Sequence, residues 1–211
     1  MKSLSRLYTC LLVGHGLFWV ASAQSALQER QKFKAEEFKL DIQTQKPTIG
    51  AGGSGVFVTI ENFPALKGMS VSSGIFEILP CAIGPPHIHP RSSELFHVLK
   101  GSFLTGFLEE NGGRYIENNV TTGQITVFPQ GLVHFVQNLD CINATFLSVF
   151  GSEDPGTLTV STRLFNINQQ ALTSTFNQPE IVIDLIKVNI PNPPAPGVGE
   201  CRKRCNLPPL N

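Results

Sequence analysis

Short apolar runs separated by turn residues dominate the middle of the chain. Runs at residues 56–60, 69–79, 95–99 and 103–107 predict strands, and runs at 125–128, 133–137, 145–150 and 158–161 continue the pattern. Lys100-Gly101 lies between two of these runs and predicts a hairpin turn. Short strands at such spacing, with glycine and proline between them, predict an all-β sandwich or barrel.

The segments on either side of these strands have different patterns. Residues 24–54 are polar with a partly helical pattern and then become glycine-rich, so we expect an N-terminal arm. Residues 172–176 and 179–185 predict short helices after the strands, which places the barrel domain at residues 55–190. Residues 191–211 form a proline-rich tail that contains cysteine.

The first 23 residues have the pattern of a secretory signal peptide. Lys2 and Arg6 form a basic start, residues 7–20 are mostly apolar, and Ala21-Ser22-Ala23 is a small-residue cleavage site. The alternative is a membrane anchor, but an apolar run of about 14 residues is short for a bilayer span. We therefore expect a secreted, extracellular protein that has no membrane association after processing.

The overall composition excludes one class of partner. Charged residues make up 15% of the chain, the formal net charge is zero, and no basic run is long enough to indicate nucleic-acid binding. The 211 residues suit one domain with a sizeable core.

Cysteines and sequons agree with secretion. The four cysteines beyond the signal are Cys81, Cys141, Cys201 and Cys205, and an even count in a secreted chain predicts two disulfides with three possible connectivities. Asn119-Val-Thr and Asn143-Ala-Thr are N-glycosylation sequons.

We expect Cys201 and Cys205 to pair locally, which leaves Cys81 to pair with Cys141. If the strand of His89 pairs antiparallel with the strand of His134, the numbers of opposite residues have a nearly constant sum. Cys81 and Cys141 match that sum within one residue, provided that a bulge corrects the parity.

Three histidines and one glutamate have the spacing of a metal site. His87 and His89 share one face of a strand because successive side chains alternate. Residues 90–93 can supply a turn, after which Glu94 begins the next strand facing inward. A reversal at Gly131 then points His134 back into the barrel. Four ligands from three strands would converge, whereas His97, with the opposite parity to Glu94, is expected to face away.

These ligand types indicate the class of metal. Three imidazole nitrogens and one carboxylate oxygen, with room for two more ligands, suit an octahedral divalent ion such as manganese or iron. A closed zinc site would more often be tetrahedral and rich in cysteine. The open positions would admit water or a small anionic substrate.

At these residues the chain resembles the cupin superfamily, and within it the germin-like and spherulin-like proteins. The resemblance rests on two motifs, His87-Ile-His89…Glu94…Gly101 and Gly123…Pro129-Gln-Gly131…His134…Asn138. It implies a jelly-roll β-barrel with His87, His89, Glu94 and His134 as ligands, commonly of manganese. It also implies a homo-oligomer, a trimer or a hexamer.

Three functions are compatible with this reading. The first is a secreted manganese oxidoreductase of the superoxide dismutase type. It requires the least of the pocket side chains, because a small anion can bind an open metal position without a specific binding group. A non-catalytic extracellular structural, storage or ligand-binding protein is the alternative. Oxalate oxidation is the third, but germins with that activity resemble one another in two pocket asparagines, and Gly74 and Gly84 occupy those places by spacing.

Overall fold

Alternating side chains on the strands enclose an apolar core. In β5 (Glu94–Lys100) and β10 (Ala144–Phe150) the even-numbered residues up to Val98 and Phe150 are buried, and the odd-numbered ones are at least partly exposed. Phe96, Phe103 and Phe146 meet inside, with ring centroids 4.4 to 5.4 Å apart. Full burial of such side chains stabilises the fold by about 1.5–3 kcal/mol each. The two-residue period therefore places one face of each of these strands in the core of the barrel.

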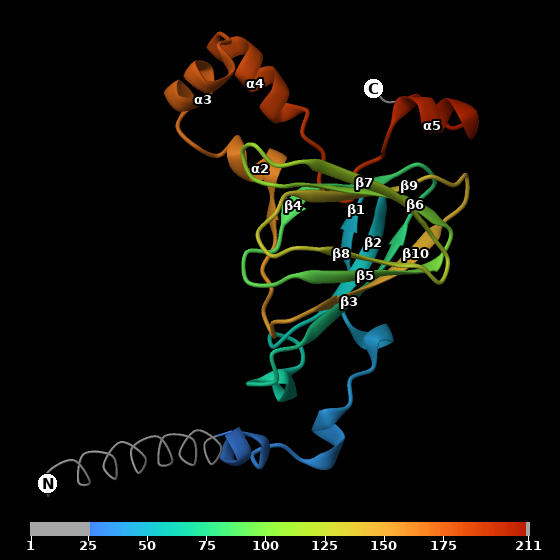
Figure 1. Cartoon of the computed structure of the whole chain (residues 1–211), viewed down its shortest axis with the longest axis vertical. Coiled ribbons are helices and arrows are strands. Elements are labelled where there is room, and N and C mark those ends of the chain that lie inside the picture. Colours follow the sequence, from blue (N-terminus) through green and yellow to red (C-terminus); the bar gives the residue numbers. More distant parts are fainter. Residues whose placement is uncertain (1–25, 210–211) are drawn as a thin grey trace, which may run out of the picture.

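The computed structural model describes residues 26–209 and contains two antiparallel sheets (Figure 1). The first sheet has the order β1-β2-β3-β10-β5-β8, and the second has the order β11-β4-β9-β6-β7. The remaining strands are β1 (Thr48–Gly50), β2 (Gly53–Val58), β3 (Ser72–Ile78), β4 (Ile83–Ile88), β6 (Ser102–Leu108), β7 (Tyr115–Thr121), β8 (Ile125–Phe128), β9 (His134–Asn138) and β11 (Leu158–Thr159).

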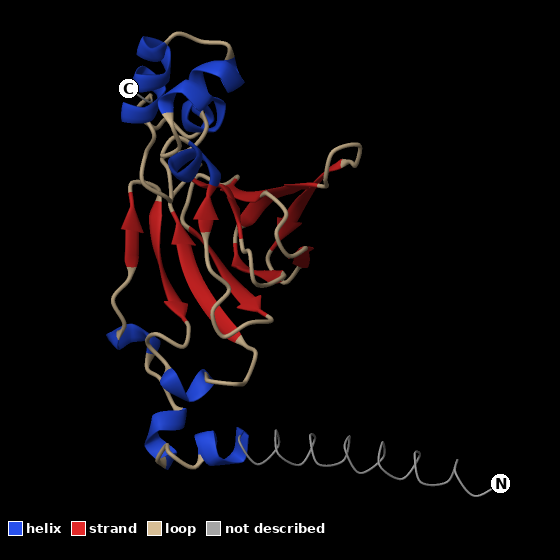
Figure 2. Ribbon diagram, turned by 90° about the vertical axis from the view of Figure 1, so that its left-hand side faces the viewer, coloured by secondary structure: helices blue, strands red, loops and turns tan. Residues whose placement is uncertain are grey.

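Helices lie beyond both ends of the strands (Figure 2). The N-terminal arm contains the 3-10 helices η1 (Ala35–Phe38) and η2 (Ile42–Thr44), and η3 (Pro64–Leu66) follows β2. At the opposite end lie α2 (Val160–Leu164), α3 (Gln169–Phe176), α4 (Glu180–Val188) and α5 (Gly199–Arg204). The Asn168 side chain caps α3 by accepting hydrogen bonds from the backbone N–H groups of Gln170 and Ala171.

Most of the expected elements are confirmed, and the all-β class with short C-terminal helices holds. β1 and the start of β2 lie within the expected arm of residues 24–54. The sequence did not predict β1, β7, α2 or α5, and the expected strand at residues 158–161 is a strand only at Leu158–Thr159, because α2 begins at Val160. The expected signal peptide, residues 1–23, lies outside the described residues. In the described part, none of the helices has the length and apolarity that a bilayer crossing requires.

The expected hairpin at Lys100-Gly101 is wrong. β5 pairs with β10 and β8, whereas β6 pairs with β7 and β9, so Gly101 carries the chain from one sheet to the other. Its φ is 92°, and a Cβ there would lie 2.7 Å from the Cβ of Ala144. The turn is a crowded corner that requires glycine.

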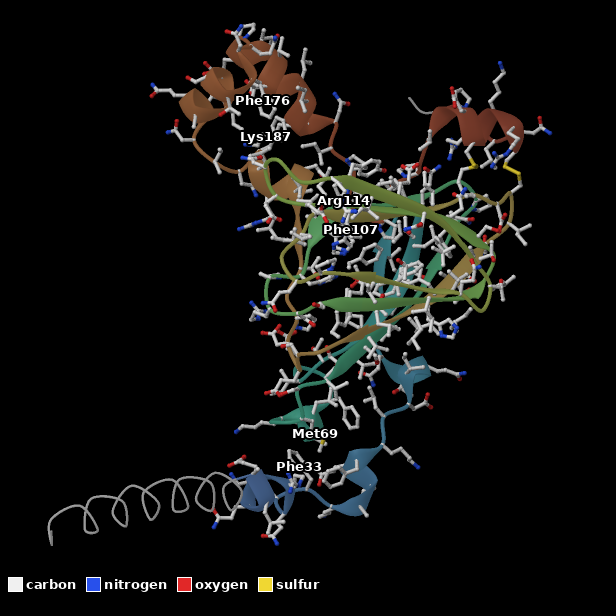
Figure 3. The ribbon with its side chains drawn as sticks, in the orientation of Figure 1. Phe33, Met69, Phe107, Arg114, Phe176 and Lys187 are labelled. Atoms are coloured by element: carbon white, nitrogen blue, oxygen red, sulfur yellow. A yellow bond between two sulfur atoms is a disulfide. The ribbon has the colours of Figure 1, made fainter. Side chains whose placement is uncertain are left out.

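The disulfides also differ from the expected pairing, although all four cysteines are in disulfides. Cys81 is bonded to Cys201, and Cys141 is bonded to Cys205, with Cα–Cα distances of 5.5 and 5.2 Å. The tail is helical at this point, so Cys201 and Cys205 lie one turn apart, and each reaches a cysteine of the barrel (Figure 3).

The two strands expected to pair near Cys81 and Cys141 do pair, but in another alignment. β4 does pair antiparallel with β9, but His134 lies opposite His87, not His89. Ile83 lies opposite Gln137, a register that would place residue 139 opposite Cys81.

Candidate metal centre

The four expected ligands come together at one end of the barrel interior. His87 lies in β4, His89 follows that strand directly, Glu94 begins β5 and His134 begins β9. One ligand atom from each lies within 4.8 Å of all the others. His89, Glu94 and His134 are 3, 5 and 2% exposed, and His87 is half-buried. We refer to these four residues as the His3Glu cage.

The carboxylate of Glu94 faces two imidazoles at short distance. Its Oε2 lies 3.1 Å from Nε2 of His89 and 3.2 Å from Nε2 of His134. The third ring, His87, packs beside His134 with a centroid separation of 4.2 Å. All three rings therefore have a ligand nitrogen in one common region.

Backbone carbonyls fix the orientation of every ring. Nδ1 of His87 contacts the Pro85 oxygen at 2.8 Å, Nδ1 of His89 contacts the Gly156 oxygen at 2.6 Å, and Nδ1 of His134 contacts the Leu132 oxygen at 2.9 Å. A carbonyl oxygen can only accept a hydrogen bond, so each Nδ1 carries the proton. A neutral ring then presents an Nε2 lone pair to the centre.

This arrangement requires a cation. An Nε2 lone pair of His89 or His134 against the Glu94 carboxylate places two acceptors at hydrogen-bond distance, which is unfavourable unless a proton or a metal ion lies between them. Imidazole nitrogen and carboxylate oxygen are ligands of divalent transition metals. The donor set thus fits a metal ion.

Surrounding side chains hold the cage. Ser148 donates a hydrogen bond to Oε1 of Glu94. Phe128 stacks on His134 at 4.4 Å, and Phe150 lies edge-on to His89 at 4.6 Å. The sequence reading did not assign these residues, although the parity of β10 places Ser148 on the inward face with Phe146 and Phe150.

Burial and the close contacts determine the protonation of two ligands. Burial lowers the pKa of His87 to about 3, so its ring is neutral at physiological pH. Burial on its own would raise the pKa of Glu94, but the imidazoles of His134 and His89 outweigh it and lower that pKa. Both groups are consequently in the form that binds a metal ion.

A cavity of about 330 Å³ opens beside the cage. His87, His89 and Glu94 form part of its wall, and phenylalanines from three strands form much of the rest. Gly84 lines this cavity, and Gly74 lies in β3, where its neighbour is the ring of Phe76.

The other candidate residues lie away from the cage. His97 is half-buried on the opposite face of β5 from Glu94. Asn119 is exposed on β7, at the edge of the second sheet, whereas Asn143 is half-buried and its amide donates to Glu77 at 3.0 Å.

The chain belongs to the cupin family. The family model described as Cupin matches residues 40–180, which include every strand of both sheets and all four cage residues. This confirms the fold and the resemblance expected from the two motifs.

Within the cupins, the homologues of this chain are spherulins and germin-like proteins. Spherulin-1A of Physarum polycephalum is 36% identical over 190 residues, covering 88% of this chain and 77% of the spherulin. Germin-like protein subfamily 2 member 2 of Arabidopsis thaliana is 35% identical over 144 residues, covering 66% of this chain and 64% of that protein.

Solved structures of oxalate oxidase have a similar fold. One, in complex with the substrate analogue glycolate, has a TM-score of 0.69 and 26% identity over 75% of this chain and 83% of that chain. Oxalate decarboxylase of Bacillus subtilis, at 23% identity and a TM-score of 0.64, shows likeness of fold only.

Proposed function

We propose that this chain is an extracellular cupin that binds manganese in the His3Glu cage and acts as an oxidoreductase on superoxide. The observation that carries the proposal is the convergence of three imidazole nitrogens and one carboxylate within 4.8 Å, beside an open cavity. A cage of this kind serves inner-sphere chemistry when a small substrate can reach it.

The donor set supports manganese or iron more than zinc. Three nitrogens and one oxygen with space for further ligands suit an octahedral ion, and the cage contains no thiolate. Affinity alone would favour copper or nickel over manganese. Manganese occupancy therefore depends on geometry and on metal supply during folding.

The side chains prepare the site for a small anion. When bound, a manganese ion supplies the one-electron steps by which two superoxide ions and two protons give dioxygen and hydrogen peroxide. The carbonyls of Pro85, Gly156 and Leu132 hold the three rings as neutral ligands. Because His87 is half-buried, we infer that substrate arrives on its side of the cage.

Secretion is part of the proposal. The basic and apolar start of the chain, the two disulfides and the exposed sequon at Asn119 support an extracellular location. The side-chain amide of Asn143 is engaged with Glu77, so Asn119 is the better glycosylation candidate.

Assembly into a homo-oligomer is also proposed. Two apolar surfaces support it: Ile181, Leu185 and Val188 on the outer side of α4, and Leu95, Ile125 and Val127 on the outer face of β5 and β8. Contiguous exposed apolar side chains of this kind mark interaction sites.

The direct test is superoxide consumption by pure, manganese-loaded protein. We expect activity above that of the same concentration of free manganese, and its loss in Glu94→Gln. The matched control is His97→Ala, which changes the opposite face of the same strand and is expected to retain activity. A manganese-loaded protein without such activity would leave the non-catalytic ligand-binding or structural role.

Oxalate oxidation is a second candidate because the chain resembles oxalate oxidase structures. The cavity argues against it: Gly84 provides no side-chain donor, and the described residues of the lining include no lysine, arginine or asparagine to bind a second carboxylate. Release of hydrogen peroxide on addition of oxalate to manganese-loaded protein would support this candidate over the first.

A further inference from the structure

The cavity beside the His3Glu cage is lined mainly by aromatic and aliphatic side chains. Phe57, Phe76, Phe146 and Phe150 line it together with Ile78 and Val136. Its described lining has no charged side chain outside the cage, and the polar groups there are the hydroxyls of Ser148 and three threonines. A superoxide ion needs no such apolar volume.

The phenylalanines form a continuous wall that reaches the cage. Phe76 stacks on Phe146 at 4.9 Å, Phe57 lies edge-on to Phe76 at 4.9 Å, and Phe57 lies 6.2 Å from Phe150. Phe150 in turn contacts His89 at 4.6 Å. A flat apolar body can therefore contact aromatic rings while another part of the same molecule reaches the metal position.

Glycines leave this volume open. Gly55 lies opposite Phe76 across β2 and β3, and a Cβ there would lie 1.9 Å from the Phe76 ring. A Cβ at Gly74 would lie 2.6 Å from the same ring. These two positions let Phe76 lie close to the sheet. On the other side, a Cβ at Gly84 would lie 3.0 Å from a methyl group of Val136.

The cavity can be reached from solvent. Thr48 and Thr157 belong to its lining and are exposed, and the tail residues Pro193 and Pro194 form another part of its edge. At about 330 Å³, its volume is at the lower end of the range for small-molecule sites, which is enough for a single aromatic ring and its substituent.

We infer that this cavity binds a small aromatic acid, with the anionic oxygen on the metal of the His3Glu cage and the ring against Phe57, Phe76 and Phe146. This inference rests on the proposed metal site and names a ligand class for it. With a divalent metal ion the cage carries one net positive charge, which complements one carboxylate, and the apolar wall provides contacts that oxalate and acetate cannot use.

The test uses the full-length mature protein loaded with manganese, with benzoate, acetate and oxalate as probes. Binding is followed by calorimetry and by the manganese electron paramagnetic resonance spectrum, which changes when an acid displaces metal-bound water. We expect benzoate to bind at least about tenfold more tightly than acetate or oxalate, equivalent to about 1.4 kcal/mol. We also expect its affinity to fall in metal-free protein.

A variant pair tests the location. Gly84→Val fills the cavity next to Val136 and is expected to weaken benzoate binding at least about tenfold while manganese content is retained. The control is Gly199→Val, at a position where a Cβ would contact nothing within 4 Å. If Gly84→Val fails to fold, the wild-type comparison of the three acids still decides.

The outcomes separate this inference from the proposed function. Tighter binding of oxalate or acetate than of benzoate, or equal benzoate binding with and without metal, would overturn the aromatic acid while leaving the manganese cage intact. A protein that binds no manganese before any acid is added would overturn the proposed function and the inference together.

Discussion

Each imidazole of the cage donates its Nδ1–H to a backbone carbonyl, and the Thr157 hydroxyl also lies 3.5 Å from Nδ1 of His89. The acceptors belong to Pro85, Leu132 and Gly156, which lie in or next to the strands and loops that carry the ligands. The hydrogen bonds that orient the rings thus follow the path of the backbone, whereas the Glu94 carboxylate accepts its hydrogen bond from a side chain, Ser148. Orientation of ligands by such outer contacts tunes metal affinity.

Removing the hydroxyl that holds Glu94 is expected to weaken metal binding without abolishing it. In Ser148→Ala the carboxylate loses its hydrogen bond at Oε1, and manganese affinity should fall about 10- to 100-fold. A metal titration monitored by electron paramagnetic resonance measures the change. Thr145→Ala, half-buried on the other face of β10, is the control, and an equal loss there would contradict this role for Ser148.

Acid is expected to destabilise the metal-free protein through His87 and Glu94. The folded pKa of His87 is about 3 against an ordinary 6.5, because burial disfavours the imidazolium. As pH falls below 6.5 the unfolded chain therefore binds a proton that the folded chain does not, and stability is lost. The pKa of Glu94 lies below its ordinary 4.5, so its contribution is lost in the same direction at lower pH.

The melting temperature of the metal-free protein, measured between about pH 7 and pH 4, checks this expectation. We expect it to decrease steadily, with a weaker pH dependence in His87→Gln and an unchanged one in His97→Ala. A melting temperature that rises as the solution becomes more acidic would contradict the account of His87.

At the scale of elements, the sequence predicts individual strands better than it predicts which strands pair. The period of two identified β5 and β10, and the alternation of His87 and His89 with the turn before Glu94 predicted that these three side chains meet, as they do. Which strands share a sheet depends on packing between distant segments, so the Gly101 corner was mistaken for a hairpin. The helix at Gly199–Arg204 was missed because its surroundings are rich in proline.

For the disulfides too, the local sequence predicts that the bonds form but not which cysteines they join. The count of four cysteines was enough to predict two bonds, but their pairing depends on how α5 docks against the barrel. There, Arg204 of α5 donates to the Leu139 oxygen, and Ala195 of the tail donates its N–H to the Ile83 oxygen at 2.8 Å. Neither contact has a signal in the local sequence.

The Cys81–Cys201 bond is expected to stabilise the fold by fixing the tail across a separation of 120 residues. The double variant Cys81→Ser/Cys201→Ser should lose about 2–4 kcal/mol of unfolding free energy in denaturant titrations. Both cysteines are replaced together because Sγ of Cys205 lies 3.5 Å from Sγ of Cys81 and could exchange with it.

The loss should be accompanied by faster hydrogen exchange where the tail pairs with β4. The backbone amides of Ala195 and Ile83 each donate to the other residue's carbonyl, at 2.8 and 3.0 Å. Manganese content should be unchanged, since no cage residue contacts these cysteines. Unchanged stability of the double variant, or a Cys201–Cys205 bond in peptide mapping of the wild type, would contradict the structure of the tail.

At the scale of the whole molecule, the barrel leaves apolar faces without a partner in the described chain. Ile183 of α4 is buried against Leu172, but Ile181 and Val188 on the other side of that helix are 66% and 76% exposed. Figures 1 and 2 show α3 and α4 standing away from the sheets. This outward position suits contact with another copy of the chain.

A charge on this face is expected to weaken assembly. Ile181→Asp would place a carboxylate in the proposed interface and should shift the mass distribution in light scattering toward the monomer. Gln178→Asp, an exposed position just before α4, serves as the control and should assemble as the wild type does. Assembly that is unaffected by Ile181→Asp would exclude this face as the contact.

The most direct test of the account is the metal content and electron paramagnetic resonance spectrum of protein purified from its natural source, compared with recombinant wild type, His134→Ala and His97→Ala. We predict a single manganese ion per chain in the wild type and in His97→Ala, with metal-bound water that exchanges with solvent. We predict no bound ion in folded His134→Ala. An ion that persists without His134, or one that disappears with His97, would contradict the cage.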